Sequence, residues 1–243
     1  MFRILLLFLT IQSVFAVLPD YEKEARWAEQ VEESLIDGDI VWIKNKPQSF
    51  LSIYTEATTK SNKTALIIHG IGIHPNWVDV IQPLRIALTE VGFNTLSLQM
   101  PVLANDASPQ QYYNFLLNDA SNRIESAIKF LKTQNQNVDL IIAHSMGTVM
   151  ASYFLANKKH NIKKYIAIGM LEKNKDYLKG INIPILDLYG NNDIETVLKS
   201  IDIRKKSAKN NSNYQQKMIL GNHFFSENNE LLFKTIQQWL NKK

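Results

Sequence analysis

The stretch Asp139-Leu140-Ile141-Ile142-Ala143-His144-Ser145-Met146-Gly147 decides how this chain folds. It begins as an apolar run of the kind found in buried strands, stops at a serine, and passes directly into a helical pattern. The residues two positions before and after the serine, Ala143 and Gly147, are small. A serine in a tight strand-to-helix turn needs such neighbours, because a bulky side chain at either position would collide with the turn. The stretch is therefore typical of a nucleophile elbow that exposes Ser145.

Strand-like and helix-like segments alternate along most of the chain. The strand-like segments are apolar throughout, as in Ala65-Leu66-Ile67-Ile68, which is typical of a mainly parallel sheet covered by helices on both faces. We expect helices at 20–37, 77–91, 109–133, 146–158, 194–208 and 226–241, and strands at 40–44, 50–55, 64–69, 94–99, 138–144, 164–169, 183–189 and 215–220.

These segments predict a single α/β domain over residues 17–243, a length that one hydrophobic core can organise. Only residues 170–182 connect two of the predicted strands after the elbow. An inserted lid domain does not fit into so short a connection, and we expect an open, shallow site.

The first 16 residues have the pattern of a secretory signal peptide. Met1-Phe2-Arg3 is a short positive start, residues 4–11 are almost wholly apolar, and Val14 and Ala16 place small side chains before a cleavage point after Ala16. The apolar stretch is short for a membrane anchor, so we expect no stable membrane span after cleavage. The chain has no cysteine, which excludes a disulfide framework, a cysteine nucleophile and a cysteine-based metal site. Export without cysteines fits the bacterial periplasm.

The composition excludes some classes of partner. The net charge is +4, but the lysines are scattered and form no basic stripe interleaved with aromatic residues, so nucleic-acid binding is not indicated. The densest basic cluster, Arg204-Lys205-Lys206 with Lys209, is expected to form a solvated helix face. No spacing of histidine and acidic residues suggests a metal site.

Three residues in separate loops after predicted strands are suited to acyl chemistry. Ser145 would be the nucleophile, and a serine hydroxyl needs an adjacent base to attack a carbonyl at neutral pH. His223 would be that base, with Asp193 holding its Nδ1 proton so that Nε2 faces the serine. Asp187 competes for the acid role, but it lies inside a predicted strand. The order serine, aspartate, histidine is the one expected when a nucleophile elbow lies in a parallel sheet.

The loop His69-Gly70-Ile71-Gly72 follows the strand at 64–69 and would complete the site. Its glycines allow the backbone to turn, so that the amides of Ile71 and Met146 could form an oxyanion hole. The same glycines would equally serve a tight turn without catalytic meaning. His144, in the variable position of the elbow, is expected to orient or pack a neighbour. The residues expected to contact substrate are Gly70, Gly72, His74, Trp77 and His144.

The chain resembles the α/β-hydrolase superfamily and, more narrowly, a family of exported bacterial α/β-hydrolase-like proteins of unassigned function. This resemblance implies the fold and the export, but no substrate. Ala143 departs from the superfamily pattern, because it stands where the first glycine of the elbow is usual. The segments that carry the resemblance are 24–30, 69–77, 96–101, 186–190 and 221–225.

Two classes of function follow. The first is an exported serine hydrolase that cleaves an ester, thioester or related acyl bond of a small molecule and requires no cofactor. The second is a non-catalytic α/β-hydrolase-like binding or assembly protein of the bacterial envelope, since a fold does not dictate an activity. The three catalytic residue types favour the enzyme, because a scaffold does not need them. Acyl transfer to an acceptor other than water stays open.

Overall fold

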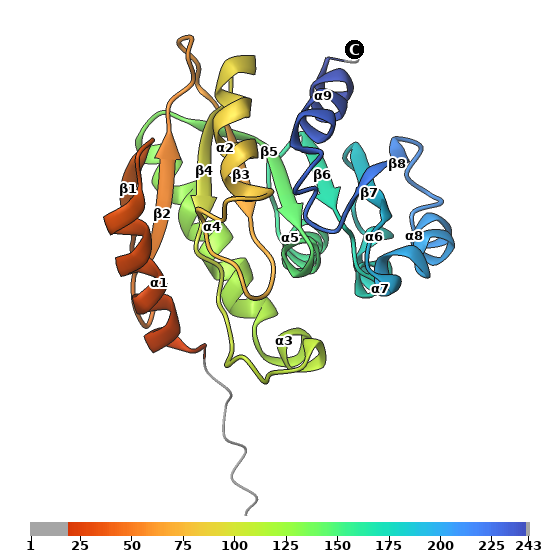
Figure 1. The fold of residues 1–243 in the computed structure, drawn as a ribbon, viewed down its shortest axis with the longest axis horizontal. Coiled ribbons are helices and arrows are strands. Elements are labelled where there is room, and N and C mark those ends of the chain that lie inside the picture. Colours follow the sequence, from red (N-terminus) through yellow and green to blue (C-terminus); the bar gives the residue numbers. More distant parts are fainter. Residues whose placement is uncertain (1–18, 242–243) are drawn as a thin grey trace, which may run out of the picture.

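The computed structural model describes residues 19–241, which form one eight-stranded sheet with helices on both faces (Figure 1). The predicted signal peptide, residues 1–16, lies outside the described residues. The strands are β1 (Asp39–Ile43), β2 (Phe50–Thr55), β3 (Lys63–Ile68), β4 (Asn94–Leu98), β5 (Asn137–His144), β6 (Lys164–Ile168), β7 (Ile185–Asn192) and β8 (Tyr214–Asn222).

The sheet has the order β1-β2-β4-β3-β5-β6-β7-β8. The pairs β1–β2 and β2–β4 are antiparallel, and every other neighbouring pair is parallel. The predicted mainly parallel sheet is thus confirmed. Because the parallel strands run in one direction, the loops that follow β3, β5, β6, β7 and β8 meet at a single edge of the sheet.

Two apolar layers lie on opposite faces of the sheet. One contains buried side chains of α4 and α5, and the other contains those of α2 and α9. A smaller cluster joins Ala28 and Val31 of α1 to Leu51 and Ile53 of β2. The helices are α1 (Tyr21–Ser34), α2 (Ile81–Ala87), α3 (Pro109–Phe115), α4 (Leu117–Thr133), α5 (Met146–Asn157), α6 (Lys175–Leu178), α7 (Glu195–Leu198), α8 (Ile201–Ser207) and α9 (Asn229–Leu240), with 3-10 turns η1 (Leu88–Val91) and η2 (Glu172–Asn174).

Two of the predicted helices are broken. The helix expected at 109–133 bends at Leu116, which allows Leu116 and Leu117 both to be buried in the core. The helix expected at 194–208 breaks near Ser200, whose hydroxyl donates to the carbonyl oxygens of Thr196 and Val197 at 2.7 and 3.0 Å. Serine side chains that bond to nearby backbone compete with helical hydrogen bonding, which explains the break.

Helix α1 and the chain after β6 also differ from expectation. The helix predicted at 20–37 ends at Ser34, since Leu35 takes an extended conformation. Residues 172–178, for which no element is predicted, form η2 and α6. Over residues 19–241, none of the helices has the length and apolar character needed to cross a bilayer.

Candidate active site

Ser145 occupies a strained turn between β5 and α5. Its backbone angles are φ 54° and ψ −122°, a region that non-glycine residues rarely adopt and that is held only by the surrounding structure. The Ser145 amide is fixed by donating to the carbonyl of Ile168, at 2.9 Å. A side chain on Gly147 would place its Cβ 2.5 Å from the carbonyl oxygen of His69, so only glycine fits there. Ala143 is fully accommodated, with 1% of its surface exposed. The structure therefore has the elbow geometry that the sequence predicts.

Asp193 and His223 lie side by side because their strands are in register. Asn192 at the end of β7 pairs with Asn222 at the end of β8, and the aspartate and the histidine come directly after them. The Nδ1–H of His223 donates to Oδ1 of Asp193 at 2.6 Å. The carboxylate also accepts the amide N–H of Ile194 at 2.8 Å. With its proton on Nδ1, the neutral imidazole keeps Nε2 as an acceptor.

Ser145 and His223 both lie beside the carboxyl end of β6. The last residue of β6, Ile168, holds the Ser145 amide, and the next residue, Gly169, contacts the imidazole. A Cβ on Gly169 would lie 2.8 Å from Cε1 of His223. In the described part of the chain, no hydrogen bond joins the Ser145 hydroxyl to the imidazole. Such hydrogen bonds are often long in enzymes without substrate and shorten when it binds.

His69 holds the loop that approaches the serine from the other side. Its Nδ1–H donates to the carbonyl of Gly70 at 2.8 Å, and its Nε2 accepts the Met100 amide N–H at 2.9 Å. Burial lowers the pKa of His69 to about 3, so the ring is neutral at physiological pH. Sequence reasoning assigned no role to His69. Its position directly before the two glycines was the only available signal.

The Ile71 and Met146 amides are available to an incoming oxygen. A Cβ on Gly70 would lie 2.9 Å from Cβ of Ser145, which shows how closely the loop approaches this serine. Neither the Ile71 nor the Met146 N–H donates a hydrogen bond to another group within residues 19–241. Met146 is the first residue of α5, where the helix dipole favours negative charge. Free N–H donors beside a serine are the arrangement that stabilises an oxyanion.

A pocket of about 540 Å³ opens beside Ser145. Ile71 and Met146 line it, as do side chains from three segments that sequence reasoning did not select, at Tyr113, Leu171 and Ile194. These positions are far apart in the chain, and no local pattern connects them. None of the residues expected to contact substrate, namely Gly70, Gly72, His74, Trp77 and His144, lies in the lining of this pocket.

His74 and Trp77 form part of an aromatic cluster. Their ring centres are 5.6 Å apart, and Trp27 of α1 lies 6.0 Å from His74. Nδ1 of His74 accepts the Asn76 amide N–H at 3.2 Å, which fixes the loop after the glycines. The structure therefore gives both residues packing contacts. Gly72 has a φ of 76°, a turn conformation that suits glycine.

His144 supports the loop that carries His223. Its Nε2–H donates to the backbone carbonyl of His223 at 2.9 Å, and the two ring centres are 4.8 Å apart. Burial, together with the nearby His223, lowers the pKa of His144 to about 3. The ring is thus a neutral donor, in agreement with the expectation that it orients or packs a neighbour. Among the described residues, no group of three histidine or acidic side chains gathers as a metal site would require.

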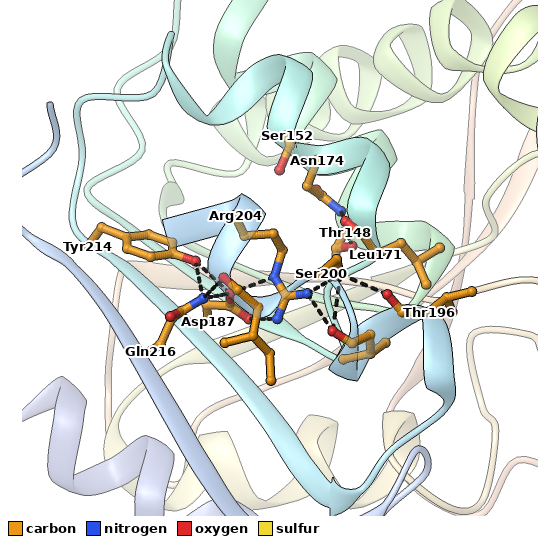
Figure 2. A network of polar contacts seen from close by, with 12 residues as sticks. Thr148, Ser152, Leu171, Asn174, Asp187, Thr196, Ser200, Arg204, Tyr214 and Gln216 are labelled. Atoms are coloured by element: carbon orange, nitrogen blue, oxygen red, sulfur yellow. Dashed lines mark hydrogen bonds and ion pairs between the residues drawn. The ribbon is translucent and has the colours of Figure 1, made fainter. Parts of the chain in front are cut away.

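Asp187, the competing acid, is engaged elsewhere. Its Oδ2 accepts Nε of Arg204 at 2.8 Å and the hydroxyl of Tyr214 at 2.6 Å, and both Asp187 and Arg204 are fully buried (Figure 2). The expectation that Arg204 belongs to a solvated face is therefore wrong: Lys205, Lys206 and Lys209 are exposed, but Arg204 turns inward to neutralise the aspartate. A buried charge needs such a partner.

Solved structures of low sequence identity share this fold. The esterase Pf2001 of Pyrococcus furiosus has a TM-score of 0.70 at 14% identity, over 86% of this chain and 94% of that one. XC6422 of Xanthomonas campestris, described as an α/β serine hydrolase without lid, has a TM-score of 0.66 at 13% identity, over 86% and 98% of the two chains. A dienelactone hydrolase of Anabaena variabilis has a TM-score of 0.67 at 15% identity, over 84% and 96%. The fold is that of the α/β hydrolases, without a lid domain.

The sequence itself leads to one family. No curated protein matches it. The family described as "Protein of unknown function (DUF3530)" matches residues 11–115 and 115–242, which together are nearly the whole chain. The chain belongs to this family, whose fold here is that of an α/β hydrolase.

Proposed function

We propose that the protein is a serine hydrolase that cleaves an ester, thioester or related acyl bond. The observation that carries the proposal is the 2.6 Å hydrogen bond between Asp193 and His223, beside a serine in a strained turn. A buried aspartate that holds the Nδ1 proton of an imidazole is the arrangement that turns Nε2 into a general base. The esterases and serine hydrolases of the same fold add support by analogy.

In the proposed reaction, Ser145 Oγ attacks the acyl carbon while its proton passes to Nε2 of His223. The negative oxygen of the tetrahedral intermediate accepts the N–H groups of Ile71 and Met146, each worth roughly 10²–10³ in rate. The bond to the leaving group breaks, and His223 donates the proton to that group, which departs as an alcohol or thiol. Water then attacks the acyl-enzyme by the same route. The products are a carboxylic acid and the free Ser145.

Turnover of 4-nitrophenyl esters tests this proposal. Wild-type protein should release nitrophenol, Ser145→Ala should reduce kcat by at least about 10⁴-fold, and His223→Ala should show a comparable loss. Glu227→Ala, which changes an exposed residue four positions after His223, is the matched control and should stay within a few-fold of wild type. Protein that turns over no ester of any chain length would contradict the proposal and favour a binding or assembly role.

We also propose that the chain is exported to the bacterial periplasm with cleavage after Ala16. The basis is the charged start, apolar stretch and small residues within residues 1–16. Expression of the full chain in a bacterium, followed by fractionation and intact mass measurement, should give a periplasmic protein that begins at Val17. A cytoplasmic protein that retains Met1 would contradict this part of the proposal.

A further inference from the structure

The pocket of about 540 Å³ beside Ser145 lies on one side of the serine, and this position indicates which part of a substrate it would hold. Its lining contains the serine and the two residues of the oxyanion hole, Ile71 and Met146, but not His223. The imidazole delivers a proton to the leaving group, so the leaving group must lie on the side of His223. The acyl group extends away from it. The pocket is therefore placed to hold the acyl part of a substrate.

Much of the pocket lining is apolar. The apolar side chains beside Ser145 in this lining are those of Ile71, Met146 and Leu171, together with Tyr113 of α3 and Ile194 before α7. Ile194 keeps 42% of its surface exposed, so there is apolar area left for a ligand to cover. Each methylene group that a ligand buries there contributes about 0.8 kcal/mol, which is about fourfold in affinity.

The charged residues of the lining are already paired with one another. Lys173 Nζ lies 2.8 Å from a carboxylate oxygen of Asp176, and Lys175 Nζ lies 2.6 Å from one of Glu172. Lys173 also lies over the Tyr113 ring, 5.6 Å from its centre. The hydrogen bonds to Asp176 and Glu172 raise the pKa of both lysines, so they remain charged and paired. The two lysines and two carboxylates cancel in charge, so an anionic acyl group would meet no net positive charge in the lining.

We propose that this pocket selects an uncharged, apolar acyl chain, so that the substrate is a neutral ester or thioester of an aliphatic acid. The inference rests on the proposed function and assigns its substrate class. A charged group on the acyl chain lowers reactivity, because it would lose its hydration against an apolar wall without gaining a net opposite charge.

Nitrophenyl esters of matched length test the selection. The wild-type protein should show a kcat/KM at least about tenfold higher for the octanoate than for the acetate, because further methylenes are buried. The mono-nitrophenyl ester of adipic acid, which ends in a carboxylate, should react at least about tenfold more slowly than the hexanoate of equal length. The adipate ester reacting as well as the hexanoate, or an acetate preference, would overturn the inference.

Variants separate the pocket from the chemistry. Leu171→Trp should fill the apolar wall and reduce kcat/KM for the octanoate at least about tenfold more than for the acetate. Ile194 is partly exposed, so Ile194→Trp should leave folding intact. This variant should also reduce kcat/KM more for the octanoate than for the acetate. Leu231→Trp, on the partly exposed surface of α9, is the matched control and should leave the preference unchanged. An unchanged preference in both pocket variants would overturn the inference alone, whereas absence of turnover with every ester would overturn the proposed function and this inference with it.

Discussion

Strand β7 presents two aspartates in very different settings. Asp187, the third residue of the strand, has no exposed surface and contacts Arg204, Tyr214 and Gln216 (Figure 2). Asp193, directly after the strand, faces the imidazole of His223. A guanidinium keeps its proton at every physiological pH, whereas an imidazole gains and loses one near neutrality. The same residue type therefore forms a buried ion pair with a guanidinium in the core and a hydrogen bond to an imidazole at the rim.

The largest expected effect is on activity, from the aspartate at the rim. Asp193→Asn should reduce kcat by about 10⁴-fold, because an amide cannot hold the imidazole in the tautomer that leaves Nε2 as a base. Steady-state turnover of a nitrophenyl ester measures this. A loss below about tenfold would show that Asp193 is not the functional acid and would erase the contrast with Asp187.

The reverse result is expected for the aspartate in the core. Asp187→Asn should lower the free energy of unfolding by about 3–5 kcal/mol, because it leaves the buried Arg204 without a countercharge. Turnover per folded molecule should change only a few-fold. Urea denaturation measures the stability, and Asp202→Asn on the exposed surface of α8 is the matched control, with an expected change below about 0.5 kcal/mol.

The pH dependence of stability extends the comparison to His69, a buried histidine that, in the part of the chain that the structure describes, has no acidic side chain as its hydrogen-bond partner. Burial lowers the pKa of His69 from 6.5 to about 3, so the unfolded chain takes up the proton first as the pH falls. The contribution of neutral His69 to the free energy of unfolding is fully present above about pH 6.5. It decreases towards pH 3, by up to about 1.4 kcal/mol per pH unit. Urea denaturation between pH 7 and 4 should show this decrease, with a shallower slope for His69→Gln. Equal slopes in wild type and variant would contradict the assignment.

The smallest effect concerns the support of His223. His144→Phe removes the hydrogen bond to the His223 carbonyl and should reduce kcat by about fivefold with little change in KM, because one net hydrogen bond is worth about 1 kcal/mol. His144→Gln, which can still donate, should recover part of the loss. Equal activity of the two variants would indicate that packing, and not the hydrogen bond, is the contribution of His144.

The parts of this fold that depend on local patterns could be predicted from the sequence. The residue types within short segments indicate the apolar strands and the elbow at Ser145. The order of Asp193 and His223 along the chain can be read in the same way. The two aspartates of β7 could be told apart because one follows a strand and the other lies inside it. The structure places the carboxylate of Asp193 against the imidazole of His223, and that of Asp187 against Arg204.

Features that depend on distant contacts could not be predicted. The inward turn of Arg204 depends on Asp187, which lies on another element, so its neighbouring lysines suggested a solvated face instead. The pocket wall combines Tyr113, Leu171 and Ile194, which no spacing connects. The packing of His74 between Trp77 and Trp27 of α1 likewise has no local signal, because α1 is distant in the sequence.

The most direct test of the central claim is to locate the covalent adduct of a fluorophosphonate by peptide mass spectrometry. The account predicts a single adduct on Ser145, no adduct in Ser145→Ala, and much slower labelling in His223→Ala and Asp193→Asn, with labelling unchanged in folded Asp187→Asn. Absence of an adduct on Ser145, or labelling that does not depend on His223, would contradict it.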